Sequence, residues 1–427
     1  MGDDHTVKAL LAALWLGAVT AVAATAEYDP AVVLKQVTEK VIAGIARTPN
    51  HTCVQTVNRQ YYHPVASTLR RPCGSVLELR RHPTPDMVLR EAGSDRLRLD
   101  VTLSDQGEIY SWAGASQFED RIDKVVTYGP LGTGAYGALL SVVFRRDVKH
   151  FRFERKLVQD GRVRLEYSFS VQESDSHYRV ILPSKLVYTA YHGTFVADAE
   201  TAQLVRITVE TAELPAASGS CMTSSTMDLT PGQIGGTDLL LPVQMRQRFV
   251  APNGDETENT TQFNQCREYR GDSTITYVEG SGEAPPGAIG KTPLTKAVDP
   301  GLRFRFELLS PIDTGRAAAG DRFTGRLTDA LRDRRGKLVA PKGAAVSGRL
   351  LRVEVDLWPR RESVVVMQPE MVGQLAVRAW RMAVGRGPIE LPMAGEDGVG
   401  AFRFNGAGAV VPKGFRTDWQ TAYFIAK

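Results

Sequence analysis

The sequence lacks the charge pattern and the cysteine spacing of a nucleic-acid-binding or metal-binding chain. Its formal net charge is only +4 over 427 residues, and its arginines alternate with acidic residues along strand-like runs. A nucleic-acid-binding domain is expected to carry a basic stripe or a known module. The four cysteines are isolated, without the close C-x-x-C pairs typical of zinc sites. We therefore expect neither a nucleic-acid partner nor a metal ion.

Long apolar runs are also missing beyond the first residues, so no later transmembrane helix is expected. At the N-terminus, Lys8 precedes an uncharged run that ends in Ala24-Thr25-Ala26, an A-x-A cleavage pattern. The run is near the minimum length for a membrane span, so a retained anchor is the alternative. We predict a signal peptide over residues 1–26 that is cleaved on export, which places the protein in the periplasm or outside the cell.

An even number of cysteines in an exported chain indicates disulfides. Four cysteines allow three connectivities, and the sequence does not choose among them. The candidates are Cys53, Cys73, Cys221 and Cys266.

An amphipathic helix is predicted directly after the signal peptide. Asp29-Pro30 is a favourable start, with Asp as N-cap and Pro in the first turn. The sequence Thr48-Pro49-Asn50 ends the pattern. Apolar residues recur at helical spacing on one face, which needs a surface to cover. These residues are Leu34, Val37, Val41 and Ile45.

From residue 52 to about 270 the apolar period changes to two, the period of half-buried antiparallel strands. Leu97, Leu99 and Val101 face one side of such a strand, and the intervening residues are polar. Asp160-Gly161 and Asn253-Gly254 are typical hairpin turns. A series of strands this long is expected to curl into a curved wall.

The stretch GPLGTGAYGALL, residues 129–140, carries three glycines in G-x-G-x-x-G spacing. A dinucleotide site requires this motif inside a parallel βαβ unit. The surrounding pattern instead predicts an antiparallel meander, so the glycines are interpreted as permitting a tight turn and a close approach to the sheet. The segment 132–146 would then be a short helical cover, and no cofactor is expected.

Residues 279–297 are rich in Gly and Pro and are predicted to be a linker. Strict alternation resumes after it and predicts a second all-β unit, a small closed or nearly closed barrel. The chain is thus predicted to be mainly β: a curved antiparallel half-barrel covered by an N-terminal and an inserted helix, plus a second, small all-β, barrel-like domain. The predicted boundaries are 1–26 for the signal peptide, 27–278 for the half-barrel, 279–297 for the linker and 298–427 for the small β domain.

Catalytic motifs are scarce. No G-x-S-x-G nucleophile elbow occurs, and the segment 174–177, which ends in His177, is interpreted as a polar turn. Glu119, Asp120 and Asp123 lie within one short segment, as in a solvated loop. Catalytic carboxylates of glycosidases usually come from separate segments. The chain is predicted not to be an enzyme, and an unrecognised hydrolase is the alternative.

The segment GTFVADAETAQLVRITVE, residues 193–210, resembles a hairpin of the periplasmic lipoprotein-carrier and sigma-regulator superfamily. The stretches at residues 50–62, 96–120, 132–144 and 261–269 are similar to exported proteins common in soil bacteria such as acidobacteria. The stretches SPIDTGRAAAGDRFTGRL and LVAPKGAAVSGRL, residues 310–327 and 338–350, look like a small β module of bacterial envelope proteins, including some conjugation-system components. The superfamily resemblance implies a curved half-barrel closed by helices, with no catalytic residue.

Three functional hypotheses follow. In the first, the half-barrel holds a lipid, an acyl chain or a lipoprotein in an apolar groove. In the second, the core is filled and the chain is a protein-interaction or sensor module of the cell envelope, and in the third it is a hydrolase. The same side chains would fill an ordinary closed core in the second hypothesis. The candidate groove residues are Tyr110, Trp112, Phe118, Tyr136, Leu140, Phe144, Tyr167 and Phe169.

Overall fold

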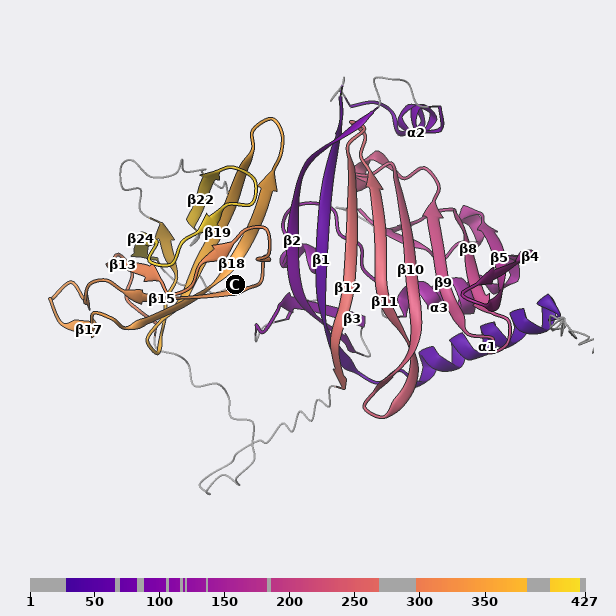
Figure 1. Cartoon of the computed structure of the whole chain (residues 1–427), viewed down its shortest axis with the longest axis horizontal. Helices are drawn as coiled ribbons and strands as arrows, with labels where there is room; N and C mark the ends of the chain where they lie inside the picture. Colours follow the sequence, from indigo (N-terminus) through magenta and orange to yellow (C-terminus); the bar gives the residue numbers. More distant parts are fainter. Residues whose placement is uncertain are drawn as a thin grey trace, which may run out of the picture.

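The computed structural model describes residues 28–65, 70–82, 88–104, 107–115, 118–119, 121–135, 137–182, 186–268, 297–381 and 400–422. The predicted signal peptide lies outside these ranges, as does all of the predicted linker except its last residue. The described chain is mainly β with few helices, as predicted (Figure 1).

Two β units follow each other along the chain, and we call them the N-terminal domain (28–268) and the C-terminal domain (297–422). The helices are α1 (Pro30–Arg47), α2 (Cys73–Arg81) and α3 (Ala138–Ser141). The strands of the N-terminal domain are β1 (His51–Pro64), β2 (Leu89–Ser104), β3 (Gly107–Trp112), β4 (Phe151–Gln159), β5 (Arg162–Val171), β6 (Arg179–Ile181), β7 (Leu186–Tyr188), β8 (Tyr191–Asp198), β9 (Leu204–Thr211), β10 (Met222–Ile234), β11 (Thr237–Val250) and β12 (Glu256–Glu268). Those of the C-terminal domain are β13 (Arg303–Leu308), β14 (Ile312–Asp313), β15 (Arg322–Leu327), β16 (Leu331–Arg332), β17 (Leu338–Ala340), β18 (Ala345–Asp356), β19 (Glu362–Val372), β20 (Leu375–Ala376), β21 (Ala379–Arg381), β22 (Gly400–Asn405), β23 (Val410–Val411) and β24 (Arg416–Thr421).

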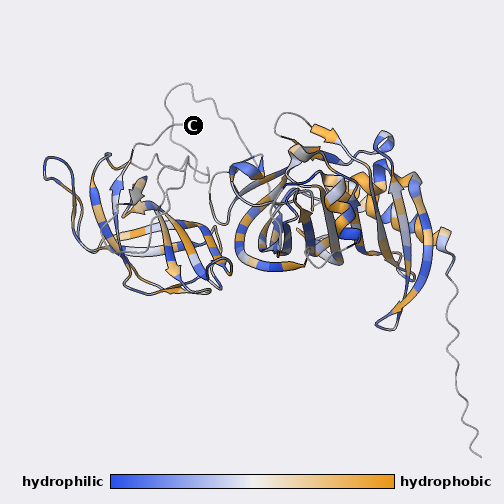
Figure 2. Cartoon of the chain, turned by 90° about the horizontal axis from the view of Figure 1, so that it is seen from above, coloured by the Kyte–Doolittle hydropathy of each residue, from blue (hydrophilic) through white to orange (hydrophobic). Residues whose placement is uncertain are grey.

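The large sheet of the N-terminal domain is antiparallel throughout. Its strands run in the order β4–β5–β8–β9–β10–β11–β12–β1–β2–β3. Figure 2, which looks down these strands, shows the sheet curving around the helical segments. The predicted alternation is confirmed on β2, where Leu97, Leu99 and Val101 are fully buried. The curved antiparallel half-barrel is therefore confirmed.

The predicted N-terminal helix is present as α1. Asp29 Oδ1 accepts a hydrogen bond from the Ala31 N–H at 2.9 Å, the N-cap contact that the sequence predicts. The buried stripe is rotated slightly from the predicted one, because Val33 is buried with Val37 and Val41 whereas Leu34 is only half-buried. A stripe of this width covers one end of the curved sheet.

The segment after the glycine motif is the predicted helical cover. α3 continues as one π-helical turn over Val142–Arg146, and Leu139, Leu140, Val143 and Phe144 are all buried. The Phe144 ring packs on Phe195 of β8 with centroids 5.0 Å apart. The space between α3 and this part of the sheet is therefore filled by side chains.

The glycines themselves allow the loop before α3 to lie against the sheet. A Cβ on Gly132 would stand only 2.0 Å from Nε2 of Gln247 on β11. Gly134 has a positive φ of +90°, and its N–H donates to Glu108 Oε2 on β3 at 2.8 Å. The neighbouring strands pair antiparallel, so the motif serves close packing and not a parallel βαβ unit.

The C-terminal domain continues the same sheet. β18 pairs with the first half of the outer edge of β2, where Asp95 lies opposite Glu354. Ala319 then bridges β2, accepting from the Arg98 N–H at 2.7 Å and donating to the Arg96 carbonyl at 2.8 Å. The second half of this edge pairs with β3 from Leu99 onward. Strand edges that are left open attract other strands, and here the two halves of the β2 edge are covered from different domains.

A buried ionic cluster lies beside this junction. Arg59 of β1 donates from Nε and Nη2 to the two carboxylate oxygens of Asp95, at 2.7 and 2.5 Å, and neither side chain is exposed. Tyr61 Oη donates to the same carboxylate at 3.0 Å. The Tyr128 ring is 4.8 Å from the Arg59 guanidinium carbon and 4.7 Å from that of Arg352 on β18. The cluster therefore connects both domains.

The C-terminal domain is itself a small, barrel-like sheet, as predicted. Its strands run in the order β22–β19–β18–β15–β13–β24–β21. In its core the Phe306 ring stacks on Phe323 and on Trp419, with centroids 5.7 and 6.0 Å apart. The predicted alternation is confirmed at the start of this domain, because Leu302, Phe304, Phe306 and Leu308 are all buried.

The four cysteines form two disulfides, Cys53–Cys266 and Cys73–Cys221. The first joins the neighbouring strands β1 and β12. The second attaches α2, which the sequence did not predict, to the start of β10. This resolves the pairing that sequence alone left open.

Candidate functional site

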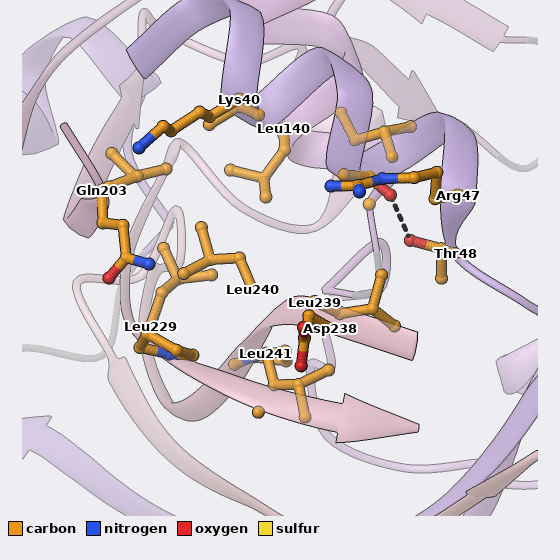
Figure 3. Close-up of a pocket in the computed structure, with 18 of the residues that line it drawn as sticks. Lys40, Arg47, Thr48, Leu140, Gln203, Leu229, Asp238, Leu239, Leu240 and Leu241 are labelled. Atoms are coloured by element: carbon orange, nitrogen blue, oxygen red, sulfur yellow. Dashed lines mark hydrogen bonds between the residues drawn. The ribbon is translucent and has the colours of Figure 1, made fainter. Parts of the chain in front are cut away.

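A cavity of about 590 Å³ lies between α1 and the end of the sheet formed by β9, β10 and β11 (Figure 3). Its wall is largely aliphatic, with polar side chains from α1 and from the β10–β11 hairpin among the lining residues. The apolar lining residues are Val41, Ile45, Ala135, Leu140, Leu204, Leu229, Pro231, Leu239, Leu240, Leu241 and Pro242. The polar ones are Lys40, Arg47, Thr48, His51, Gln203, Gln233 and Asp238.

Two glycines shape the cavity. Gly44 of α1 lines it, and a Cβ added there would meet nothing within 4 Å, so the missing side chain leaves space. Gly232 of β10 pairs with Leu239 of β11, and a Cβ added to Gly232 would lie 2.7 Å from the Cδ1 of the nearby Leu241. A glycine inside a helix or a strand weakens that element. At both positions the glycine lowers the stability of its own helix or strand, and its missing side chain determines the shape of the cavity wall.

The polar lining carries more positive than negative charge. Lys40 donates from Nζ to the Thr201 carbonyl at 2.5 Å, and Arg47 donates from Nε to the Ala43 carbonyl at 3.2 Å. Asp238 accepts from Gln233 Nε2 at 2.7 Å. Among the described residues neither cation is paired with a carboxylate of the lining. An apolar interior with these cations beside it suits an amphiphile with a polar or anionic head.

His51, at the start of β1, is buried beside the cavity. Burial lowers the pKa of its imidazole below the usual 6.5, although a hydrogen bond from Nδ1 to the Pro49 carbonyl, 2.8 Å long, opposes this shift. The imidazole is therefore neutral in the folded protein at neutral pH. It provides an uncharged polar group next to the aliphatic wall.

The lowered pKa of His51 is expected to reduce the free energy of unfolding of the protein on mild acidification. Because the folded pKa lies below the unfolded value, the unfolded chain takes up a proton first as the pH drops through about 6.5. The free energy of unfolding of the native protein should therefore fall relative to that of His51→Gln between about pH 7.5 and pH 5.5. Urea titrations of both proteins at the two pH values measure this difference. An unchanged difference would show that His51 does not titrate in this way.

The predicted groove residues fall into separate places. Leu140 lines the cavity. Phe144, Tyr167 and Phe169 are buried in the core cluster next to it, and Tyr167 Oη donates to the Pro30 carbonyl of α1 at 2.8 Å. These aromatic residues belong to the same buried cluster as the apolar residues of α1, whereas the apolar wall of the cavity is aliphatic.

The remaining groove candidates lie elsewhere. Tyr110 and Trp112 of β3 belong to a different cluster near the C-terminal domain. Phe118 is exposed, and Tyr136 lies outside the described residues. The structure does not gather the eight candidates into one groove, and their contact with a ligand stays a prediction.

A buried Asp147 links three segments that the sequence did not connect. His177 Nδ1 lies 2.6 Å from Asp147 Oδ1, and Tyr191 Oη donates to Asp147 Oδ2 at 2.7 Å. Burial and the neighbouring carboxylate raise the pKa of Tyr191, so the phenol remains a donor. The contacts tie the end of the helical cover to β8. Sequence reasoning missed them because Asp147 precedes His177 by a whole hairpin.

No group of three or more His, Cys, Asp or Glu side chains with the geometry to hold a metal ion occurs among the described residues. No helix within the described part of the chain has the length and apolarity needed to cross a membrane.

No protein-family model and no curated protein matches the chain. Solved structures that it resembles include a LolA superfamily protein from Nitrosomonas europaea, with 10% identity, 57% of this chain and 95% of that chain covered, and a TM-score of 0.24. A putative outer membrane lipoprotein-sorting protein domain from Vibrio parahaemolyticus has 11% identity, coverages of 55% and 91%, and a TM-score of 0.25. A DUF1329 family protein from Desulfovibrio piger has 9% identity, coverages of 56% and 95%, and a TM-score of 0.26. Sequence identities of 9–11% and TM-scores of 0.24–0.26 say nothing about the function of this chain.

Proposed function

We propose that the chain is a non-enzymatic binding protein that holds the acyl chain of a lipid or lipoprotein in the cavity under α1. The observation that supports this proposal is the cavity itself, at about 590 Å³. Small-molecule sites are typically about 300–1,000 Å³ and mostly apolar, with a few polar groups that orient the ligand. Each methylene group buried from water contributes about 0.8 kcal/mol. Aliphatic walls alone therefore supply affinity, without any chemical step.

The polar part of the lining fits the other end of such a ligand. Lys40 and Arg47 lie on α1 on either side of Leu140 in the view of Figure 3, and both are long, flexible cations. A carboxylate or phosphate head would gain charge-assisted hydrogen bonds there. The two disulfides support the location that goes with this proposal, an oxidising compartment outside the cytoplasm.

Native mass spectrometry of the exported protein, followed by extraction of the bound material, is the direct test. A co-purifying lipid or fatty acid supports the proposal. The interaction module is supported instead if three results occur together. The purified protein carries no ligand, it does not bind palmitate in a fluorescence-displacement assay, and it captures one envelope protein.

Substitution of Gly44 gives a sharper test. Gly44→Phe places an aromatic ring into open space on the cavity side of α1, so it should fill the cavity and lower the affinity for palmitate at least tenfold. A loss of tenfold corresponds to about 1.4 kcal/mol, less than two buried methylene groups. The measurement is displacement of a fluorescent fatty acid from the purified full-length protein.

Gly44→Ala is the matched control. It adds one methyl group, leaves the cavity open and should raise stability by about 0.5–1 kcal/mol, since alanine replaces glycine inside a helix. Equal affinities of Gly44→Phe and Gly44→Ala for palmitate would exclude this cavity as the binding site.

A further inference from the structure

The end of the molecule far from the cavity carries a second surface of interest, which we call the tip. It is formed where β1 ends, where β2 begins and where the chain turns from β18 into β19, at the top of Figure 1. The tip residues are Val65, Val88, Arg90, Trp358, Arg360 and Arg361.

Backbone contacts hold these segments together. The Val65 N–H donates to the Val88 carbonyl at 3.0 Å, which extends the β1–β2 ladder outward. The N–H groups of Leu357 and Trp358 both donate to the Ala92 carbonyl, at 2.8 and 3.2 Å. The β18–β19 turn is thereby fixed beside the β1–β2 end, and the tip is one continuous surface built from both domains.

Apolar side chains at the tip are turned outward. Val65, Val88 and Trp358 are 56%, 59% and 42% exposed. The Arg90 guanidinium carbon lies 4.1 Å from the centroid of the Trp358 ring, a cation–π contact. Arg90 therefore covers one face of the indole, while a large part of each of the three apolar side chains remains exposed.

The charge around these apolar groups is positive. Arg360 and Arg361 are exposed, and within the described residues neither is paired with a carboxylate. The nearby carboxylates are Glu91, which is exposed, Asp356, which is half-buried at the end of β18, and Glu362, which is paired with Arg403. The tip thus combines an exposed indole, two exposed valines and an excess of arginine.

We propose that the tip binds the surface of a bilayer that contains anionic lipids. Trp prefers the boundary between headgroups and acyl chains, and arginine near an anionic leaflet is attracted to it over about a Debye length. In Figure 1 the β18–β19 turn extends beyond the neighbouring strands of its domain, whereas hot spots for protein partners usually lie in pockets. A flat, negatively charged surface suits a projecting, basic and partly apolar tip.

Binding of a bilayer through the tip would determine where the cavity lies relative to that bilayer. His51 lines the cavity and His63 contacts Trp358, with ring centroids 6.2 Å apart, and both residues are on β1. A strand rises about 3.3 Å per residue, so the two ends are roughly 40 Å apart. A protein bound through the tip would hold its cavity away from that bilayer. Ligand binding and bilayer binding are therefore separable by experiment.

The test is co-sedimentation of the purified full-length protein with vesicles. We expect at least tenfold tighter binding to phosphatidylcholine vesicles containing about one third phosphatidylglycerol than to phosphatidylcholine alone. The double variant Arg360→Gln/Arg361→Gln should bind the anionic vesicles about 25-fold more weakly, which corresponds to about 1 kcal/mol for each arginine. Trp358→Ala should weaken binding about tenfold, because apolar area is lost.

The matched control is Arg334→Gln/Arg335→Gln, which makes the same charge change at two exposed arginines of the β16–β17 hairpin, away from the tip. This variant should bind as the native protein does. Tryptophan emission should shift to the blue on anionic vesicles, and the shift should be lost in Trp358→Phe. Equal weakening by the control, or binding that does not depend on Trp358, would overturn the proposal in favour of diffuse charge attraction. The absence of any binding to anionic vesicles would overturn it outright.

Discussion

Replacement of Arg59 by methionine is expected to lower the free energy of unfolding by about 3–5 kcal/mol, because it leaves a buried carboxylate without its partner. Arg59 and Asp95 have no exposed side-chain surface, and Arg59 also donates from Nη1 to the Tyr128 carbonyl at 2.8 Å. Methionine approximates the volume of arginine but donates nothing. Urea unfolding followed by far-UV circular dichroism measures the loss.

Two further variants separate the ionic effect from general damage. Arg59→Met/Asp95→Leu removes both charges and should recover most of the lost stability, since an apolar pair of similar volume often replaces a buried ion pair at little cost. Arg305→Met breaks an exposed pair with Asp418, 2.7 Å apart, and should cost less than about 1 kcal/mol. A double variant as unstable as Arg59→Met would contradict this account of the cluster.

The second large effect is expected at Gly320, where the C-terminal domain comes closest to β2. Its φ is +101°, and a Cβ there would lie 2.2 Å from the Arg98 carbonyl oxygen and 3.1 Å from the Trp112 ring. Gly320→Val should therefore separate Ala319 from β2. Amide hydrogen exchange at Arg98 and Ala319, whose N–H groups cross the junction, should accelerate by orders of magnitude.

Gly343→Val is a closely matched control, because Gly343 has a φ of +83° but open space around its Cβ. It should cost about 1–2 kcal/mol from backbone strain alone. Gly320→Val should add a further 1–3 kcal/mol, roughly the cost of overpacking. Amide exchange at Arg98 and Ala319 should stay unchanged in Gly343→Val. If it also stayed unchanged in Gly320→Val, close packing at Gly320 would not hold the domains together.

The strands were predictable because side-chain alternation is a local property. The buried faces of β2 and β13 follow directly from alternating Leu, Val and Phe residues. The hairpin at Asp160-Gly161 is equally local, and both residues have positive φ, 52° and 73°. In the 193–210 hairpin, Asp198 Oδ1 accepts a hydrogen bond from the Thr201 N–H at 2.9 Å, a contact between residues only three positions apart and therefore equally local.

The features that were not predictable join distant segments. The choice among three disulfide pairings depends on β1 lying between β12 and β2, which no local pattern specifies. α2 is short and only weakly amphipathic, and its covalent attachment to Cys221 gives it a fixed place on the surface. Docking of Ala319 against β2 likewise required the whole fold.

The cavity was hidden from sequence reasoning for a different reason. Aromatic residues attract attention as groove candidates, yet in this structure they pack against each other and fill the core. The open space arises where aliphatic side chains from α1 and the β10–β11 hairpin fail to meet. Gly44 was the available signal, since a glycine on the buried side of a helix leaves a gap.

The shared edge of β2 also bears on how the chain matures. The N-terminal domain precedes β18 in the chain, so until the C-terminal domain folds, the Gly93–Asp95 part of that edge has unpaired backbone groups. A nascent chain in this state is open to strand exchange with its neighbours. Folding of the C-terminal domain ends this exposure, and a chain shortened before residue 345 would lack the strand that covers this part of β2.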